Sequence, residues 1–317
     1  MPAVLPLSLL ESLSEPLQAS LEALRTWIAG QERVVVAYSG GVDSALVAAI
    51  AAEQLGDRAE AVTAVSPALA PHLRQEARDQ ARWLGLRHRE IATAELEDPA
   101  YRSNPDDRCY ACKRELHRKL APIAAAAGGA RVLDGVNVDD LGDHRPGIQA
   151  AREHGVLSPL ADLQIDKAAV RQLSRALGLP WWDKPAQPCL ASRFPYGEPI
   201  SRPRLERVAA AEQWLRQQGF GALRVRSQGE TARLEFGAGD LNRVLQRLSQ
   251  EAAWENGLAD RPEDGDPSFR QALVQRFLAL GFTAVALDLE GLVSGKLNRN
   301  LRAAPDLDGA AIPGPAA

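Results

Sequence analysis

Short apolar runs alternate with helical patterns over the first half of the chain. The runs lie at 34–38, 61–65, 87–91 and 131–133, and the helical patterns between them lie near 43–55, 71–84 and 112–126. This alternation predicts parallel strands joined by crossover helices, since a parallel connection must return along the outside of the sheet. The predicted fold class is therefore α/β, with a doubly wound parallel sheet.

A turn-rich segment, in which prolines recur, separates this region from a second one, and its prolines are expected to prevent regular structure. Beyond it, helical patterns at 204–218, 240–252 and 268–279 and apolar or alternating runs at 223–226, 232–236 and 283–287 predict a second, smaller α/β domain. The predicted organisation is an N-terminal helical segment at 1–30, a first domain at 31–180, a linker at 181–203, a second domain at 204–301 and a disordered tail at 302–317. Disorder is also expected at 260–267, which is acidic and contains proline.

One motif follows the first predicted strand and runs directly into a helix: Ser39, Gly40, Gly41, Val42, Asp43 and Ser44. Backbone N–H groups of such a turn converge on one point, and the helix dipole adds positive potential there, so an anion is expected. The motif lacks the Gly-Lys-Ser/Thr ending of an ordinary P-loop and the G-x-G-x-x-G of a dinucleotide site. It resembles instead the S-G-G-x-D-S pyrophosphate loop (PP-loop) of ATP pyrophosphatases. The motif predicts an ATP site; a turn that only joins strand to helix is the alternative.

A second loop, at 134–143, follows the last predicted strand of the sheet and therefore ends at the same edge as the PP-loop. The Gly135 backbone and the Asn137 amide are expected to contact ATP, and the Asp43 carboxylate is expected to bind Mg²⁺ through oxygen. The remaining carboxylates of this loop either complete the metal or ribose contacts or are solvated turn residues: Asp139, Asp140 and Asp143.

Composition and charge narrow the classes of partner. The 317 residues have a net charge of −4 and a pI near 5.8, which disfavours a broad surface for nucleic acid. The sequence has no apolar stretch long enough to span a membrane and no basic leader, so a cytoplasmic protein is expected.

The three cysteines are too few, and odd in number, for a disulfide framework. Cys109 and Cys112 form a C-x-x-C just ahead of a predicted helix, where the helix end and nearby cations favour thiolates or a metal. Packing as two small apolar side chains is the alternative. Cys189 lies in the proline-rich linker, where an exposed, activated thiol is expected rather than an incidental loop cysteine. We expect the three thiols to converge on one site.

Arginines alternate along two short strands of the second domain. Arg224, Arg226 and Arg233 would share one face if these strands pair, and Arg193 lies in the linker. Because the guanidinium fork matches carboxylate and phosphate oxygens, this set is the candidate clamp for an anionic substrate. The alternative is an exposed face that is salt-bridged by Glu230 and Glu235.

Motifs spread from about Gln31 to Asn298 resemble the LarE family, ATP-dependent sulfur transferases that make the organic part of the nickel-pincer nucleotide cofactor. Its markers here are S-G-G-V-D-S at 39–44, D-D-R-C-Y-A-C-K at 106–113, D-G-V-N-V-D-D-L-G-D-H-R-P-G at 134–147, S-P-L at 158–160, W-D-K-P-A-Q-P-C-L-A-S-R-F-P-Y-G at 182–197, L-D-L-E-G at 287–291 and S-G-K-L-N at 294–298. The resemblance implies a PP-loop ATP pyrophosphatase fold, similar to the adenine nucleotide alpha hydrolases.

The resemblance also implies a reaction. A carboxylate of pyridinium-3,5-biscarboxylic acid mononucleotide attacks the α-phosphate of ATP, and a thiolate, by analogy Cys189, displaces AMP from the acyl adenylate. In one version Cys189 gives up its own sulfur and becomes dehydroalanine. In the other, Cys109, Cys112 and Cys189 hold a four-iron four-sulfur cluster with one iron open for hydrosulfide. The C-x-x-C favours the cluster version.

Two departures from the family pattern lie in the region expected to bind substrate: Gln228 stands where a histidine is common, and Val293 where an arginine is common. The resemblance further implies a homo-oligomer formed through the second domain, with a hexamer as one form, and other enzymes of nickel-pincer biosynthesis as partners. A PP-loop tRNA thiolase with an iron–sulfur cluster is the competing interpretation, and the acidic composition weighs against it.

Overall fold

The computed structural model describes residues 13–142, 146–256, 258, 268–293 and 295–299. The chain forms two compact units: Met1–Ala191 with Gly197–Ala209, and Ser192–Tyr196 with Ala210–Ala317. The disorder expected at 260–267 and 302–317, and the predicted role of Asp143, fall outside the described residues.

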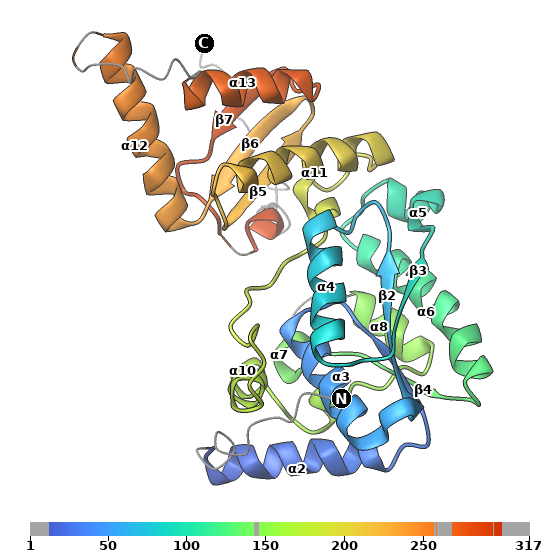
Figure 1. Ribbon diagram of the computed structural model, residues 1–317. Helices are drawn as coiled ribbons and strands as arrows, with labels where there is room; N and C mark the ends of the chain where they lie inside the picture. Colours follow the sequence, from blue (N-terminus) through green and yellow to red (C-terminus); the bar gives the residue numbers. More distant parts are fainter. Residues whose placement is uncertain (1–12, 143–145, 257, 259–267, 294, 300–317) are drawn as a thin grey trace, which may run out of the picture. The chain divides into compact units, whose positions relative to one another are not determined.

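The first unit contains the expected doubly wound sheet (Figure 1). Its strands lie in the order β3-β2-β1-β4, and every pairing is parallel. Their bounds are β1 (Val34–Ala37), β2 (Ala59–Val65), β3 (His88–Ala92) and β4 (Arg131–Leu133). Val34 pairs with Ala59 on one side and Arg131 on the other, so β1 is central and the PP-loop leaves the middle of the sheet.

Helices cover both faces of this sheet because alternate residues of β1 point to opposite sides. Val34 and Val36 pack with four long helices: α2 (Glu15–Ala29), α3 (Val42–Leu55), α4 (Pro71–Trp83) and α10 (Lys167–Ala176). Val35 packs on the other face against Leu116 and Leu120 of α6 (Arg108–Ala126). The short helices of this unit are α5 (Pro99–Arg102), α7 (Val138–Leu141), α8 (Pro146–Glu153) and α9 (Pro159–Asp162).

The second unit is the expected smaller α/β structure. Strands β5 (Leu223–Gln228) and β6 (Thr231–Phe236) pair antiparallel, and β7 (Ala284–Leu287) joins β6 in parallel. The helices are α12 (Ala238–Glu255), α13 (Phe269–Ala279) and the part of α11 (Arg202–Gln217) from Ala210 onwards. Buried aromatic rings form much of its core, among them Phe220, Phe236, Phe277 and Phe282.

Two boundaries differ from the sequence prediction. Helix α6 begins at Arg108, so the C-x-x-C lies inside its first turns and not ahead of it. The buried positions 108, 111, 116, 120 and 124 already follow the helical period from that point. The linker also contains a 3-10 turn at Leu190–Arg193 and the start of α11, where Pro203 is tolerated because the first turn needs no N–H donor from it.

The buried His117 of α6, which lies beside the exposed His154, predicts acid sensitivity. His117 is buried, its ring centroid lies 5.8 Å from that of His154, and neither of its ring nitrogens has a hydrogen-bond partner among the described residues. Burial, then Lys113 and His154, lower the pKa of His117 to about 3. The unfolded chain therefore binds this proton more readily than the folded one, and stability should fall as the pH drops from about 6.5 towards 3.

The expected loss is on the order of 1 kcal/mol for each pH unit below 6.5. Urea unfolding at pH 7, 6 and 5 would measure this loss. His117→Leu should flatten the pH dependence of the free energy of unfolding, whereas the control His72→Gln should leave that dependence unchanged. A parallel fall in the free energy of unfolding of wild type and His117→Leu would contradict this origin.

Candidate active site

The PP-loop closes on itself through its two serines. The Ser44 hydroxyl accepts from the Ser39 N–H at 3.2 Å and donates to the Gly41 carbonyl at 3.1 Å, and the two hydroxyls lie 3.1 Å apart. Gly40 has φ +70°, and a Cβ on it would lie 3.0 Å from Ala77, so both its conformation and its surroundings favour glycine. Helix α3 begins immediately afterwards, at Val42.

The loop after β4 meets the PP-loop, as the parallel sheet predicts. The Asn137 side-chain amide donates to the Asp43 carboxylate at 3.0 Å, and the Asn137 side-chain oxygen caps α7 by accepting from the Asp139 N–H at 3.0 Å. Asp139 accepts from the Lys167 N–H and Asp140 from the Asn137 N–H, which are the contacts of turn residues. Asp43 is thus the carboxylate at the loop that faces the expected ATP site.

Gly135 lies against the PP-loop backbone. A Cβ at this position would be 2.6 Å from the Ser44 nitrogen and 2.9 Å from its Cα, atoms that cannot move without displacing the start of α3. The sequence interpretation expected the Gly135 backbone to contact ATP. In the structure the lack of a side chain at Gly135 allows the loop after β4 to pack directly against the PP-loop backbone.

Gly135→Ala should therefore weaken ATP binding at least tenfold and cost roughly 1–3 kcal/mol of stability, the usual range for overpacking. Titration calorimetry with ATP and urea unfolding would measure the two effects. Gly30→Ala is the matched control, because a Cβ there meets its nearest atom at an ordinary 3.5 Å. Unchanged ATP affinity in Gly135→Ala would contradict this prediction, because it would show that ATP binding tolerates a displaced Ser44 backbone.

Two lysines that sequence reasoning did not assign reach the PP-loop. The Lys167 amine pairs with the Asp43 carboxylate, and the Lys184 amine donates to the Gly40 carbonyl at 3.0 Å and pairs with Glu76 at 2.7 Å. Neither residue is near the loop in sequence. Each lysine follows an aspartate, and this local pattern alone does not predict a contact with the PP-loop.

The segment that carries Cys189 is fixed at both ends to the edge of the sheet. Lys184 holds its start at the PP-loop, Gln187 lies 3.3 Å from His72 at the start of α4, and the Leu190 N–H donates to the Ala68 carbonyl at 2.8 Å. Because five residues span at most about 17 Å, Cys189 lies within that distance of Lys184.

The three cysteines come within electrostatic range of one another. Burial, then Glu95, Cys189 and Cys109 raise the pKa of the Cys112 thiol, which favours its protonated form over the thiolate that was one of the two sequence interpretations of the C-x-x-C. One expected cation, Arg114, is instead paired with Asp98 at 2.6 Å. Cys109 and Cys189 are exposed.

Buried polar groups surround the thiols. Burial raises the pKa of Tyr101, and Cys189, Cys112 and Glu95 raise it further. The Tyr101 hydroxyl and one Glu95 oxygen have no hydrogen-bond partner among the described residues. Those residues contain no set of three His, Cys, Asp or Glu side chains arranged for a single metal ion. The three thiols therefore lie in one region, but they are not arranged around a single metal position.

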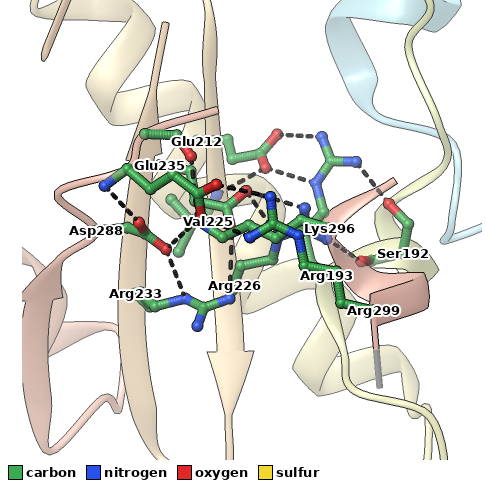
Figure 2. Close-up of polar contacts among 12 residues, drawn as sticks. Ser192, Arg193, Glu212, Val225, Arg226, Arg233, Glu235, Asp288, Lys296 and Arg299 are labelled. Atoms are coloured by element: carbon green, nitrogen blue, oxygen red, sulfur yellow. Dashed lines mark hydrogen bonds and ion pairs between the residues drawn. The ribbon is translucent and has the colours of Figure 1, made fainter. Parts of the chain in front are cut away.

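Three of the four predicted arginines, Arg193, Arg226 and Arg233, form a largely buried charge network in the second unit (Figure 2). Arg193 pairs with Glu212 at 2.7 Å, and Arg226 pairs with Glu235 at 2.9 Å and donates to the Ser192 carbonyl at 2.6 Å. Arg226 and Arg193 are both buried. Both guanidinium groups therefore pair with carboxylates.

The other two arginines are less enclosed. Arg233 lies opposite Arg226 in the β5–β6 register and contacts Glu235 at 3.3 Å and Asp288 at 3.4 Å. The half-buried Arg224 has its pKa lowered to about 10 by burial and by Arg226 and Arg193. The salt-bridged alternative was right about Glu235, but the face is buried and not exposed.

A small pocket opens at this network. Its lining consists of Arg193, Pro195, Arg226, Gln228, Arg233 and Leu297. Sequence reasoning missed Glu212, Asp288 and Lys296 as members of the network; the signal for Glu212 was a glutamate on the apolar face of a helix, between Val208, Ala211 and Leu215.

Comparisons with known proteins agree with the nucleotide site. The asparagine synthase family profile matches residues 19–103. The chain is 50% identical to an uncharacterized protein from Synechocystis, over 90% of this chain and 99% of that protein. It is 34% identical to pyridinium-3,5-bisthiocarboxylic acid mononucleotide synthase from Lactiplantibacillus plantarum, over 85% of this chain and 90% of that one. It is also 31% identical to a glutamine-hydrolysing GMP synthase component from Methanoculleus marisnigri, over 48% of this chain and 52% of that one. Among the described residues, no helix is long and apolar enough to cross a membrane.

Proposed function

Since the chain belongs to the LarE family, we propose that it uses ATP to transfer sulfur to pyridinium-3,5-biscarboxylic acid mononucleotide, giving the bisthiocarboxylate precursor of the nickel-pincer nucleotide. The observation that carries the proposal is the position of Cys189, on a segment that is fixed to the PP-loop at Lys184 and to the loop after β2 at Ala68. A nucleotide site and a nucleophilic thiol on neighbouring loops are what an adenylating sulfur transferase needs.

In the first step a substrate carboxylate oxygen attacks the α-phosphorus of ATP, and pyrophosphate leaves. Backbone N–H groups of the PP-loop would hold the pyrophosphate portion, except those of Ser39 and Gly41, which donate to serine hydroxyls within the loop. Asp43 would contribute a carboxylate ligand to Mg²⁺, which proteins bind through one or two carboxylates together with phosphate oxygens. Asn137 orients that carboxylate by its hydrogen bond at 3.0 Å.

If Cys189 is the sulfur source, its sulfur attacks the acyl carbon of the adenylate in the second step, AMP leaves, and a thioester forms. The Cα of Cys189 then loses a proton, the Cβ–S bond breaks, and the sulfur stays on the acyl carbon as a thiocarboxylate. The chain then retains dehydroalanine and reacts once.

We favour the second sulfur source, a four-iron four-sulfur cluster held by Cys109, Cys112 and Cys189. The gathering of three thiols supports it, since sacrifice requires Cys189 alone, and three thiolates around a cluster need not meet at one metal position. Metal binding would also replace the proton of the buried Cys112. When bound, the cluster would supply inorganic sulfur, so Cys189 would not be consumed.

The second unit would hold the anionic substrate. We propose that the more exposed Arg224 and Arg233 contact carboxylate or phosphate oxygens, and that Arg193 and Arg226 position them through their pairs with Glu212 and Glu235. We further propose that this unit forms a homo-oligomer and that the protein works in the cytoplasm, supplying other enzymes of nickel-pincer biosynthesis. Gln228 and Val293 would give it substrate contacts that differ from those of its relatives.

The test is an anaerobic reaction of the purified protein with Mg-ATP and the biscarboxylate. Pyrophosphate should appear only with substrate present, and mass spectrometry should detect the thiocarboxylate. Iron and sulfide analysis, with the intact mass before and after turnover, separates the two sulfur sources, because only sacrifice removes H₂S from the chain. Thiolation of tRNA in a parallel reaction with tRNA as the substrate, with no thiocarboxylate formed from the biscarboxylate, would overturn the proposal in favour of a tRNA thiolase.

A further inference from the structure

The PP-loop contains no cation of its own, whereas an ordinary P-loop includes a lysine that reaches the β- and γ-phosphates. We propose, on the basis of the proposed function, that Lys167 is that cation: Asp43 holds its amine beside the loop, and the amine moves to the β- and γ-phosphates when ATP binds. The pair between the Lys167 amine and the Asp43 carboxylate is the observation that points to it.

The backbone of Lys167 is fixed while its amine can move. Its N–H donates to the Asp139 carboxylate at 3.1 Å, and α10 continues into Val170 and Leu173, which are buried in the same core as α3. The side chain is 31% exposed. Only side-chain torsions have to change for the amine to leave Asp43.

No interaction within α10 explains why a lysine occupies position 167. Lys167 is the first residue of the helix, where the dipole disfavours a positive charge, and Asp166 already caps the helix by accepting from the Ala169 N–H at 2.7 Å. A cation here is explained by what it faces, which is the Asp43 end of the PP-loop.

Lys184, the other lysine at the loop, already has two partners. Its side chain is 12% exposed, and its amine pairs with Glu76 and donates to the Gly40 carbonyl. Among the described residues Lys167 forms an ion pair with Asp43 alone. An incoming polyphosphate would be repelled by the Asp43 carboxylate and attracted by the Lys167 amine, so an exchange of partners removes the conflict.

A double-mutant cycle separates binding by Lys167 from mere neutralisation of Asp43. ATP binding is measured by calorimetry in EDTA, so that metal binding by Asp43 does not contribute, for wild type, Asp43→Asn, Lys167→Met and the double variant. We expect Asp43→Asn to bind ATP several-fold more tightly than wild type, because it releases the amine and removes a negative charge. The double variant should bind at least tenfold more weakly than Asp43→Asn, the usual size of a charged hydrogen bond.

If Lys167 only neutralises Asp43, the double variant will bind ATP as tightly as Asp43→Asn, and the proposal is wrong. Asp43→Asn binding no more tightly than wild type would overturn the exchange. Lys119→Met, on the surface of α6, is the matched control and should keep the wild-type affinity. Wild-type protein that binds no ATP in a parallel titration with Mg²⁺ would contradict the proposed function itself, whereas the other outcomes leave that function standing. Lys167→Arg should retain most of the affinity, and thermal melts establish that each variant is folded.

Discussion

Replacing Cys189 with alanine is expected to abolish sulfur transfer while pyrophosphate release in a single turnover continues. Adenylation needs the PP-loop and a substrate carboxylate, and no atom of Cys189 takes part in it. Every later step passes through the sulfur of Cys189 or through the cluster that it would help to hold. Because Cys189 is exposed, the change should leave folding stability within about 0.5 kcal/mol.

Quenched-flow measurement of pyrophosphate and mass spectrometry of the thiocarboxylate would check this result. Cys109→Ala is the informative companion: it should lose sulfur transfer if a cluster is the sulfur source and keep it if Cys189 is sacrificed. A Cys189→Ala protein that still makes thiocarboxylate would remove the proposed nucleophile, and one that releases no pyrophosphate would place Cys189 in the adenylation step.

The strands and the PP-loop could be predicted because their signals are local. β1 is an apolar run that ends in Ser39 and Gly40, and a loop of this kind between strand and helix has few other conformations available. Parallel order then places the loop after β4 at the same edge, which is why this loop and the PP-loop could be expected to share one nucleotide, although the contact of Asn137 with Asp43 was not predicted.

The remainder of the candidate site depends on contacts between distant residues. Lys167 lies 124 positions from Asp43, and Lys184 lies 144 positions from Gly40. The raised pKa of Cys112 could not be predicted, because the helix dipole and nearby cations can be read from the sequence, whereas burial and the charge of Glu95 depend on packing. The carboxylate partner of Arg193 could not be predicted for the same reason, since Glu212 comes from a helix and not from the strands.

Removing the charge of Glu235 is expected to be the most destabilising single change in the second unit. Glu235 is 0% exposed, accepts from Arg226 at 3.0 Å and pairs with Arg233 at 3.3 Å. Glu235→Gln would leave Arg226 buried beside Arg224 and Arg193 without its carboxylate. Breaking one partner of a buried ion pair costs about 3–5 kcal/mol, because the remaining charge is desolvated and uncompensated.

Urea unfolding of Glu235→Gln against Glu230→Gln would measure this cost, since Glu230 is exposed in the turn between β5 and β6 and should change stability by less than about 0.5 kcal/mol. The double variant Arg226→Met, Glu235→Leu should recover much of the loss, because two apolar side chains of similar size bury no unpaired charge. If the double variant recovers stability but no longer binds the biscarboxylate, the Arg226–Glu235 pair acts by positioning Arg224 and Arg233. Equal stability of Glu235→Gln and Glu230→Gln would contradict this prediction. It would mean that the network tolerates a buried guanidinium without a carboxylate partner.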